Sequence, residues 1–247
     1  MEVHAHTHTP RKKWTHYFWE FFMLFLAVFC GFLAEYALEH KIETNREKQY
    51  ARSMVEDLKL DTAALNRIIE LRTRRIKDLD SISILLNDPI DTSYLSKLYH
   101  SSLHIRRTAL MKFVYNDRTI QQLKNSGSLR LIRNQIVSDS IVLYDSHVRR
   151  LEKTEENEQE YIRAMIPYSY KIFDGRVYDK MLSEDDRIRR PPGSPALLPY
   201  TKEELNDFIS SLYSVKAANI AYRSFSIGLR KKAANLLETV EKEYHLK

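Results

Sequence analysis

The stretch that decides the fold is Tyr17–Leu38, which reads YFWEFFMLFLAVFCGFLAEYAL. Residues 21–34 carry no charge, and the two charged side chains of the stretch, Glu20 and Glu35, stand near its ends. As a helix, this stretch of about 22 residues extends for roughly 33 Å, because each residue adds about 1.5 Å. The hydrocarbon core of a bilayer is about 30 Å thick. We therefore expect residues 17–38 to form a transmembrane helix.

A cleaved signal peptide is the alternative interpretation of this apolar stretch. Cleavage requires small residues one and three positions before the cut. A cut after Ala34 would place Phe32 at the third position, and a cut after Ala37 would place Glu35 there. Neither site fits, so the sequence predicts an uncleaved single-pass membrane anchor.

The charges that flank the span bear on its orientation. The basic residues Arg11, Lys12 and Lys13 precede it and favour retention of residues 1–16 in the cytoplasm. A comparable set of basic residues follows it: Lys41, Arg46, Lys48 and Arg52. The charge count alone therefore leaves the orientation open, but long domains translocate largely regardless of charge. We expect a short cytoplasmic tail over residues 1–16 and an extracytoplasmic domain over residues 39–247.

One face of the predicted span is suited to helix packing. At about 100° per residue, Ala27, Gly31 and Ala34 all fall within about 40° of Glu20. Small side chains let two helices approach closely, and Ala27 and Gly31 have the small-xxx-small spacing. The stripe predicts contact with a second copy of the chain or with another membrane protein. Ordinary composition explains it equally well, because Gly and Ala are common in such helices.

The rest of the chain has the composition of a helical protein. It contains five Gly and seven Pro among 247 residues, about 2% Gly against a usual value near 7%. Sandwiches, barrels and doubly wound sheets need many turns, and phosphate-binding loops need closely spaced glycines. The sequence therefore predicts an all-α fold.

Between Gly31 and Pro89 the chain has neither Gly nor Pro, which permits one helix from the membrane to about Leu86. Ten positions with alternating spacings of three and four predict the seam of a bundle or coiled coil, and seven of them are apolar. These positions are Val55, Leu58, Thr62, Leu65, Ile69, Arg72, Ile76, Leu79, Ser83 and Leu86.

Further helices are expected at 94–104, 117–124 and 128–166, with the polar stretch 152–160 of the third exposed to solvent. Residues 167–200 are expected to be irregular because they contain Asp174-Gly175 and a Pro-rich run at 191–195. Thr201 and Glu204 form a capping box that opens the last helix. Three long and two short helices predict an antiparallel bundle of about 200 residues.

Two segments carry a resemblance to a bacterial family: SMVEDLKLD at 53–61 and LKNSGSLRLIRN at 123–134. With the basic tail and single span before them, they resemble single-pass membrane proteins of unknown function that are frequent in the Bacteroidota. The similarity covers roughly residues 11–145. It implies a protein of the bacterial cytoplasmic membrane with a helical, periplasmic domain, and it implies no activity.

The histidines are weak candidates for metal ligands. His4, His6 and His8 alternate in the N-terminal tail, and His100 and His104 have the i, i+4 spacing of a shared helix face. The glutamate of a His-Glu-x-x-His site is absent from the intervening positions. We therefore expect no metal site and no cofactor.

Catalysis is not expected either. The sequence has no Gly-x-Ser-x-Gly motif, and its single cysteine, Cys30, lies inside the predicted span. Two basic clusters are expected to be solvated helix or loop surface, with anionic lipid or an acidic partner as the alternative and nucleic acid excluded outside the cytoplasm. The clusters are Arg67, Arg72, Arg74, Arg75 and Lys77, and Arg187, Arg189 and Arg190.

The sequence thus predicts a membrane-anchored helical interaction or scaffold protein whose partners are the bilayer and a second copy or another membrane protein. The alternative is a ligand-binding ectodomain that acts through a partner membrane protein. In that case Tyr168, Tyr170, Arg187 and the Pro-rich run would cap a pocket between helices.

Overall fold

The computed structural model describes residues 13–86, 90–185 and 187–246, and it divides the chain into two compact units, Met1–Gln49 and Tyr50–Lys247. The first helix, α1 (Trp14–Leu85), contributes to both units. Its predicted end at Leu86 agrees with the observed end to within one residue. The all-α fold is confirmed, because no β-strand occurs in the described ranges and the two antiparallel bridges are isolated.

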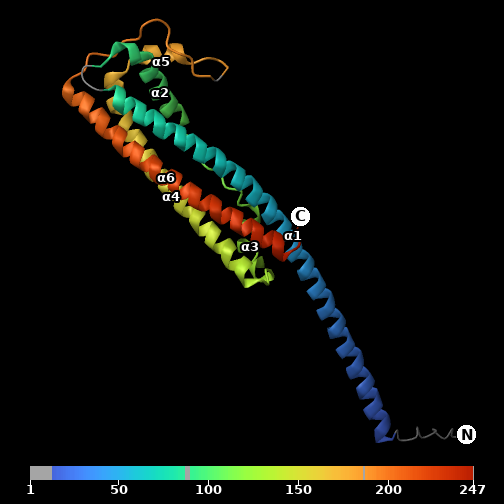
Figure 1. Cartoon of the computed structure of the whole chain (residues 1–247). Helices are drawn as coiled ribbons and strands as arrows, with labels where there is room; N and C mark the ends of the chain where they lie inside the picture. Colours follow the sequence, from blue (N-terminus) through green and yellow to red (C-terminus); the bar gives the residue numbers. More distant parts are fainter. Residues whose placement is uncertain (1–12, 87–89, 186, 247) are drawn as a thin grey trace, which may run out of the picture. The chain divides into compact units, whose positions relative to one another are not determined.

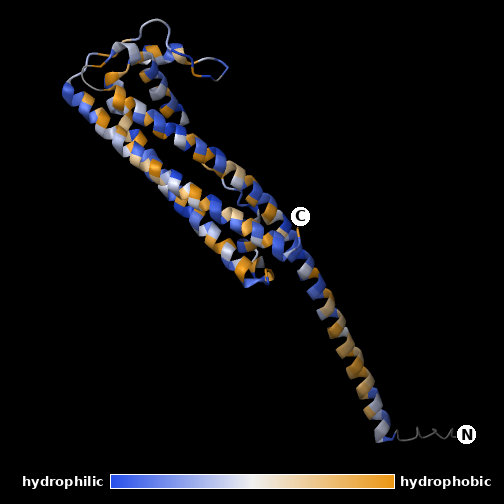
Figure 2. Ribbon diagram, viewed as in Figure 1, coloured by the Kyte–Doolittle hydropathy of each residue, from blue (hydrophilic) through white to orange (hydrophobic). Residues whose placement is uncertain are grey.

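In the first unit, α1 has the character of a membrane span. It contains an 18-residue window with a mean hydropathy of 2.1, the one candidate span among the described residues. Every residue from 13 to 42 is exposed. Figure 2 shows this part of α1 as a band of hydrophobic residues. Such a surface is stable only where an apolar medium or another protein covers it.

The second unit is a helical bundle (Figure 1). Its further helices are η1 (Thr92–Tyr94), α2 (Leu95–Thr108), α3 (Arg118–Asn125), η2 (Ser128–Leu131), α4 (Gln135–Ile172), α5 (Gly175–Met181) and α6 (Lys202–Glu243). In Figure 1, α4 runs toward the end of the bundle that holds α5, and α6 returns antiparallel beside it. The antiparallel arrangement expected from the sequence is therefore confirmed.

Local sequence explains most helix boundaries. Asn134 caps α4, because its side chain accepts a hydrogen bond from the Val137 amide at 3.2 Å. The capping box at Thr201 and Glu204 is present at the start of α6, as predicted. Gly127 adopts a left-handed conformation with φ 66°, which ends the turn after α3.

Three of the expected boundaries are wrong. The helix expected from residue 128 begins at Gln135, because residues 128–131 form the separate 3₁₀ helix η2 and Asn134 caps α4. The irregular region does not begin at residue 167, because α4 continues through Pro167 to Ile172. A proline inside a helix costs about 3 kcal/mol, but Met165 and Ile172 on either side of it are buried in the core, which favours the helix. Asp174 then caps α5, a helix that the Asp-Gly pair had indicated only as a turn.

The bundle has two apolar cores rather than one. The first core includes Leu58, Leu65, Val148, Leu151 and Tyr222, together with α3. The second core includes Leu79, Ile162, Phe208 and Val215, together with α2 and α5. On each long helix, polar residues stand between the two sets, so a polar layer separates the cores along the bundle.

Candidate functional site

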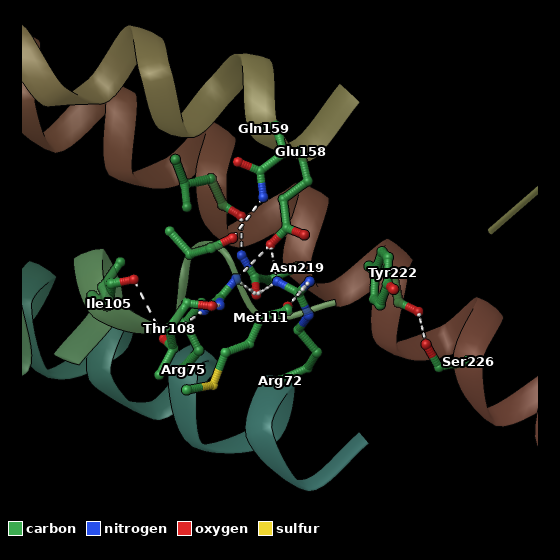
Figure 3. Close-up of polar contacts among 12 residues, drawn as sticks. Arg72, Arg75, Ile105, Thr108, Met111, Glu158, Gln159, Asn219, Tyr222 and Ser226 are labelled. Carbon is green, nitrogen blue, oxygen red and sulfur yellow. Dashed lines mark hydrogen bonds and ion pairs between the residues drawn. The ribbon is translucent and has the colours of Figure 1, made fainter. Parts of the chain in front are cut away.

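The polar layer consists of Arg72 and Arg75 on α1, Thr108 at the end of α2, Glu158 on α4 and Asn219 on α6. Its members lie between the two apolar cores and face one another across the bundle (Figure 3). The side chains of both arginines and of the glutamate are 0% exposed. Charged side chains are almost never fully buried unless they are paired, so the layer is the most unusual feature of the bundle.

A shared carboxylate oxygen holds the two arginines. Arg75 Nη1 donates to Glu158 Oε1 at 2.8 Å, and Arg72 Nη1 donates to the same oxygen. The Nη1 atoms of both arginines also approach Asn219 Oδ1 at 3.4 Å. The Arg72 guanidinium lies over the Tyr222 ring, 4.2 Å from its centroid. These contacts join α1, α4 and α6 at one level.

The same arginines hold the segment that follows α2. Arg75 Nε donates to Thr108 Oγ1 at 3.1 Å, and Arg75 Nη2 donates to the Thr108 carbonyl oxygen. Arg72 Nη2 donates to the Met111 carbonyl oxygen at 3.2 Å. Next to them, Gln159 Nε2 donates to the Ala109 carbonyl oxygen at 2.6 Å. These side chains thus supply hydrogen-bond donors to backbone carbonyl oxygens that have no partner within the helix where α2 ends.

The layer carries two guanidinium groups and one carboxylate. Burial, helped by the neighbouring Arg72, lowers the pKa of Arg75 to about 10. Burial also raises the pKa of Glu158, and the two guanidinium groups oppose that rise. From α4, the half-buried Glu155 interacts electrostatically with Arg72 as well. The positive charge of Arg75 is therefore kept inside the bundle although burial disfavours the charged form of its guanidinium group.

Two atoms of the layer, Arg72 Nε and Glu158 Oε2, lack a hydrogen-bond partner among the described residues. An incompletely satisfied buried ion pair contributes little net stability, whereas loss of one partner is strongly destabilising. An axial shift of α4 against α1 would separate Glu158 from the arginines and leave the charges unpaired. The layer therefore fixes which positions of the helices face each other.

The layer corrects two expectations from the sequence. Arg72 and Arg75 do not belong to a solvated face, although Arg74 in the same cluster does, since it is exposed and pairs with the exposed Glu70. The stretch 152–160 is not wholly solvated, because Glu158 is buried. A signal was present in the sequence: Arg72 occupies a seam position, and Glu158 lies seven residues after the buried Leu151.

The histidine candidates are not brought together as metal ligands. His104 Nδ1 lies 2.6 Å from Asp78 Oδ2 on α1, whereas His100 lines a cavity on the surface. Within the described ranges, no group of three His, Cys, Asp or Glu side chains is placed to hold a metal ion. His4, His6 and His8 lie outside the described residues.

The predicted packing stripe of the span is exposed along its length. Glu20, Ala27, Gly31 and Ala34 all lie in the exposed part of α1, and Glu20 Oε1 is 3.1 Å from His16 Nε2. A Cβ added at Gly31 would meet no atom within 4 Å. The stripe is therefore sterically open to a second helix.

The sequence places Tyr168, Tyr170 and Arg187 around one pocket, and the structure gives the surroundings of the two tyrosines. Tyr168 packs against the second apolar core, and the Tyr170 ring instead lies against the Arg106 guanidinium, 4.6 Å away. A cavity of about 360 Å³ occurs elsewhere, lined by Ser93, Ser96, Lys97, His100 and Arg190. Its lining residues come from η1, from the start of α2 and from Arg190, the last residue of the arginine cluster at 187–190.

Comparison with known proteins gives no assignment, because no family model, no curated protein and no solved structure matches the chain.

Proposed function

We propose that the protein is a single-pass membrane scaffold, anchored by residues 17–38, that binds a second copy or another membrane protein through the small-residue face of the span and the surface of the bundle. The observation that carries the proposal is the apolar part of α1, exposed on every side from residue 13 to residue 42. A bilayer would cover this surface. The basic residues at 11–13 favour a cytoplasmic tail, and we place the bundle in the periplasm, in line with the resemblance to the Bacteroidota family.

Topology is tested with single cysteines in the full chain. Cys30 is the only native cysteine, so a Cys30→Ser background gives a blank. Thr7→Cys reports the tail, and Glu160→Cys reports an exposed position of α4. In intact spheroplasts, a membrane-impermeant maleimide should label the second cysteine and leave the first unlabelled until the cells are lysed. The reverse pattern, or extraction of the protein by alkaline carbonate, would refute the proposed topology.

Partner binding through the span is tested by crosslinking in native membranes, followed by mass spectrometry. Gly31→Leu should reduce the crosslinked species several-fold, because a larger side chain separates two closely packed helices. Phe29→Leu is the matched control, since Phe29 lies on the opposite face of the helix at about 100° per residue. Equal crosslinking by both variants would exclude the stripe as the contact.

Ligand binding by the bundle is the second candidate function, and the cavity beside Arg190 favours it. The volume of about 360 Å³ falls within the range of about 300–1,000 Å³ that small-molecule sites occupy. A purified full chain that carries a bound small molecule would support this function.

A further inference from the structure

The cavity at the start of α2 brings together hydrogen-bond donors from two segments far apart in sequence. Ser93 of η1 and Ser96 of α2 supply hydroxyl groups, while Lys97 and His100 in the first two turns of α2 supply an ammonium group and an imidazole. Arg190 comes from the segment after α5, which lies at the same end of the bundle as α2 (Figure 1). The lining thus offers two permanent positive charges and several further donors.

The positive charges that line the cavity are not paired with described carboxylates. Neither Lys97 nor Arg190 has an ion-pair partner among the described residues. The adjacent Arg187 and Arg189 share one carboxylate, Asp185, at 3.9 Å each. Among the described ion pairs, Asp185 thus serves Arg187 and Arg189 and does not reach Arg190.

The carboxylate nearest in sequence is already engaged. Asp91 Oδ1 accepts a hydrogen bond from the Ser93 amide at 2.9 Å and caps the turn before α2. Hydrogen bonds from Ser93 lower the pKa of Asp91, so it remains ionised and in place. Lys97 and Arg190 line the cavity, whereas Asp91 is not among its described lining residues.

We infer that this cavity binds a small molecule that carries a phosphate group, held by Lys97 and Arg190 and oriented by His100 and the two serines. A phosphate presents three strong acceptor oxygens, which match a set of separate donors better than the two oxygens of a carboxylate. Arg binds such a group bidentately, and Lys binds it as a point charge. The volume leaves room for an organic moiety beside the phosphate.

This inference gives the second candidate function its ligand class and does not depend on the membrane anchor. The phosphate group has two possible sources, a soluble phosphorylated compound or the headgroup of an anionic lipid. The two are separated by the probe: inorganic phosphate added to the detergent-purified full chain, and reconstitution into phosphatidylcholine vesicles with or without phosphatidic acid.

The measurement is the thermal unfolding midpoint of the full chain, because a ligand that binds the native state raises it in a saturable manner. Sodium acetate at equal ionic strength controls for general salt effects. Lys97→Gln and Arg190→Gln should each weaken phosphate binding by roughly tenfold, the loss expected for one charge-assisted contact. Lys231→Gln, at an exposed position of α6, is the matched control and should bind like the parent chain.

The outcomes are separable. A soluble ligand is supported if inorganic phosphate stabilises the parent chain in a saturable manner and only Lys97→Gln and Arg190→Gln lose this effect. The same pattern with phosphatidic acid vesicles alone supports a lipid headgroup. No saturable effect of either probe, or equal losses in all three variants, overturns the inference. Arg190→Lys keeps the charge and should retain most of the binding, which separates loss of the contact from misfolding.

None of these results affects the topology test of the proposed membrane anchor.

Discussion

The two parts of α1 distribute apolar and charged side chains in opposite ways. In residues 13–42 every side chain is exposed, although Phe, Leu and Trp dominate the sequence. In residues 50–85 one face is buried, and that face includes Arg72 and Arg75 beside Leu65 and Leu79. Burial along α1 therefore depends on the surrounding medium and on the position around the helix. Residue type alone would have predicted the reverse for the exposed apolar side chains of residues 13–42 and for the buried Arg72 and Arg75.

The largest effect is expected from removing the carboxylate of the polar layer. Glu158→Ala leaves two buried guanidinium groups without their shared anion, which costs about 3–5 kcal/mol in the free energy of unfolding. Denaturant unfolding of the full chain in detergent, followed by circular dichroism, measures the change. Glu160→Ala is the matched control because this residue of α4 is exposed, and it should stay within about 0.5 kcal/mol. Similar losses in the two variants would contradict the burial of Glu158.

The next effect concerns the apolar part of α1. Leu26→Arg places a charge near the middle of the proposed span, at a cost of about 2.5–3.5 kcal/mol for insertion. We expect a clear fall in the carbonate-resistant membrane fraction. Leu38→Arg is the control at the end of the span, where a long side chain reaches the headgroups and the cost is small. If Leu26→Arg integrates as well as the parent chain, residues 17–38 do not span a bilayer.

A third experiment replaces the polar layer with apolar side chains. The triple variant Arg72→Leu, Arg75→Met and Glu158→Leu removes both signs of charge at once, so it should lose less stability than Glu158→Ala, although the Thr108 and Met111 carbonyl oxygens lose their guanidinium donors. Asn219 keeps a partner, since its Nδ2 donates to the Val215 carbonyl oxygen at 3.0 Å. The stability is measured as for Glu158→Ala. A loss as large as that of Glu158→Ala would show that the buried ion pairs themselves stabilise the bundle.

Much of the fold could be predicted from the sequence because it depends on local patterns. The absence of Gly and Pro between residues 31 and 89 indicates the long first helix, and the Thr201 and Glu204 box fixes the start of α6. The continuation of α4 past Pro167 could not be predicted in this way. It depends on Ile172 packing into a core whose other members come from distant helices.

The polar layer and the cavity escaped prediction for the same reason. Glu158 lies 86 residues from Arg72, and no local pattern states that the two face each other. In the sequence Arg190 and His100 belong to separate motifs, and only the path of the chain at the end of the bundle brings them to one cavity. Charged residues at seam positions, such as Arg72, are the signal that sequence reasoning can use, since the 3–4 spacing marks the buried face.

The smallest effect is expected from Arg74→Met, at an exposed position of α1 next to the buried Arg75. Arg74 is adjacent to Arg75 but exposed, and its ion pair with Glu70 four residues earlier lies on the solvated face. Exposed pairs of this spacing contribute about 0.3–0.5 kcal/mol and are screened by salt. Arg74→Met should therefore lower the unfolding free energy by no more than about 0.5 kcal/mol, and less at high salt. Arg75→Met should cost several times more, because it leaves the Thr108 carbonyl oxygen without its guanidinium donor and Glu158 with one arginine instead of two. Equal effects of the two substitutions would mean that the buried face of α1 has been assigned wrongly.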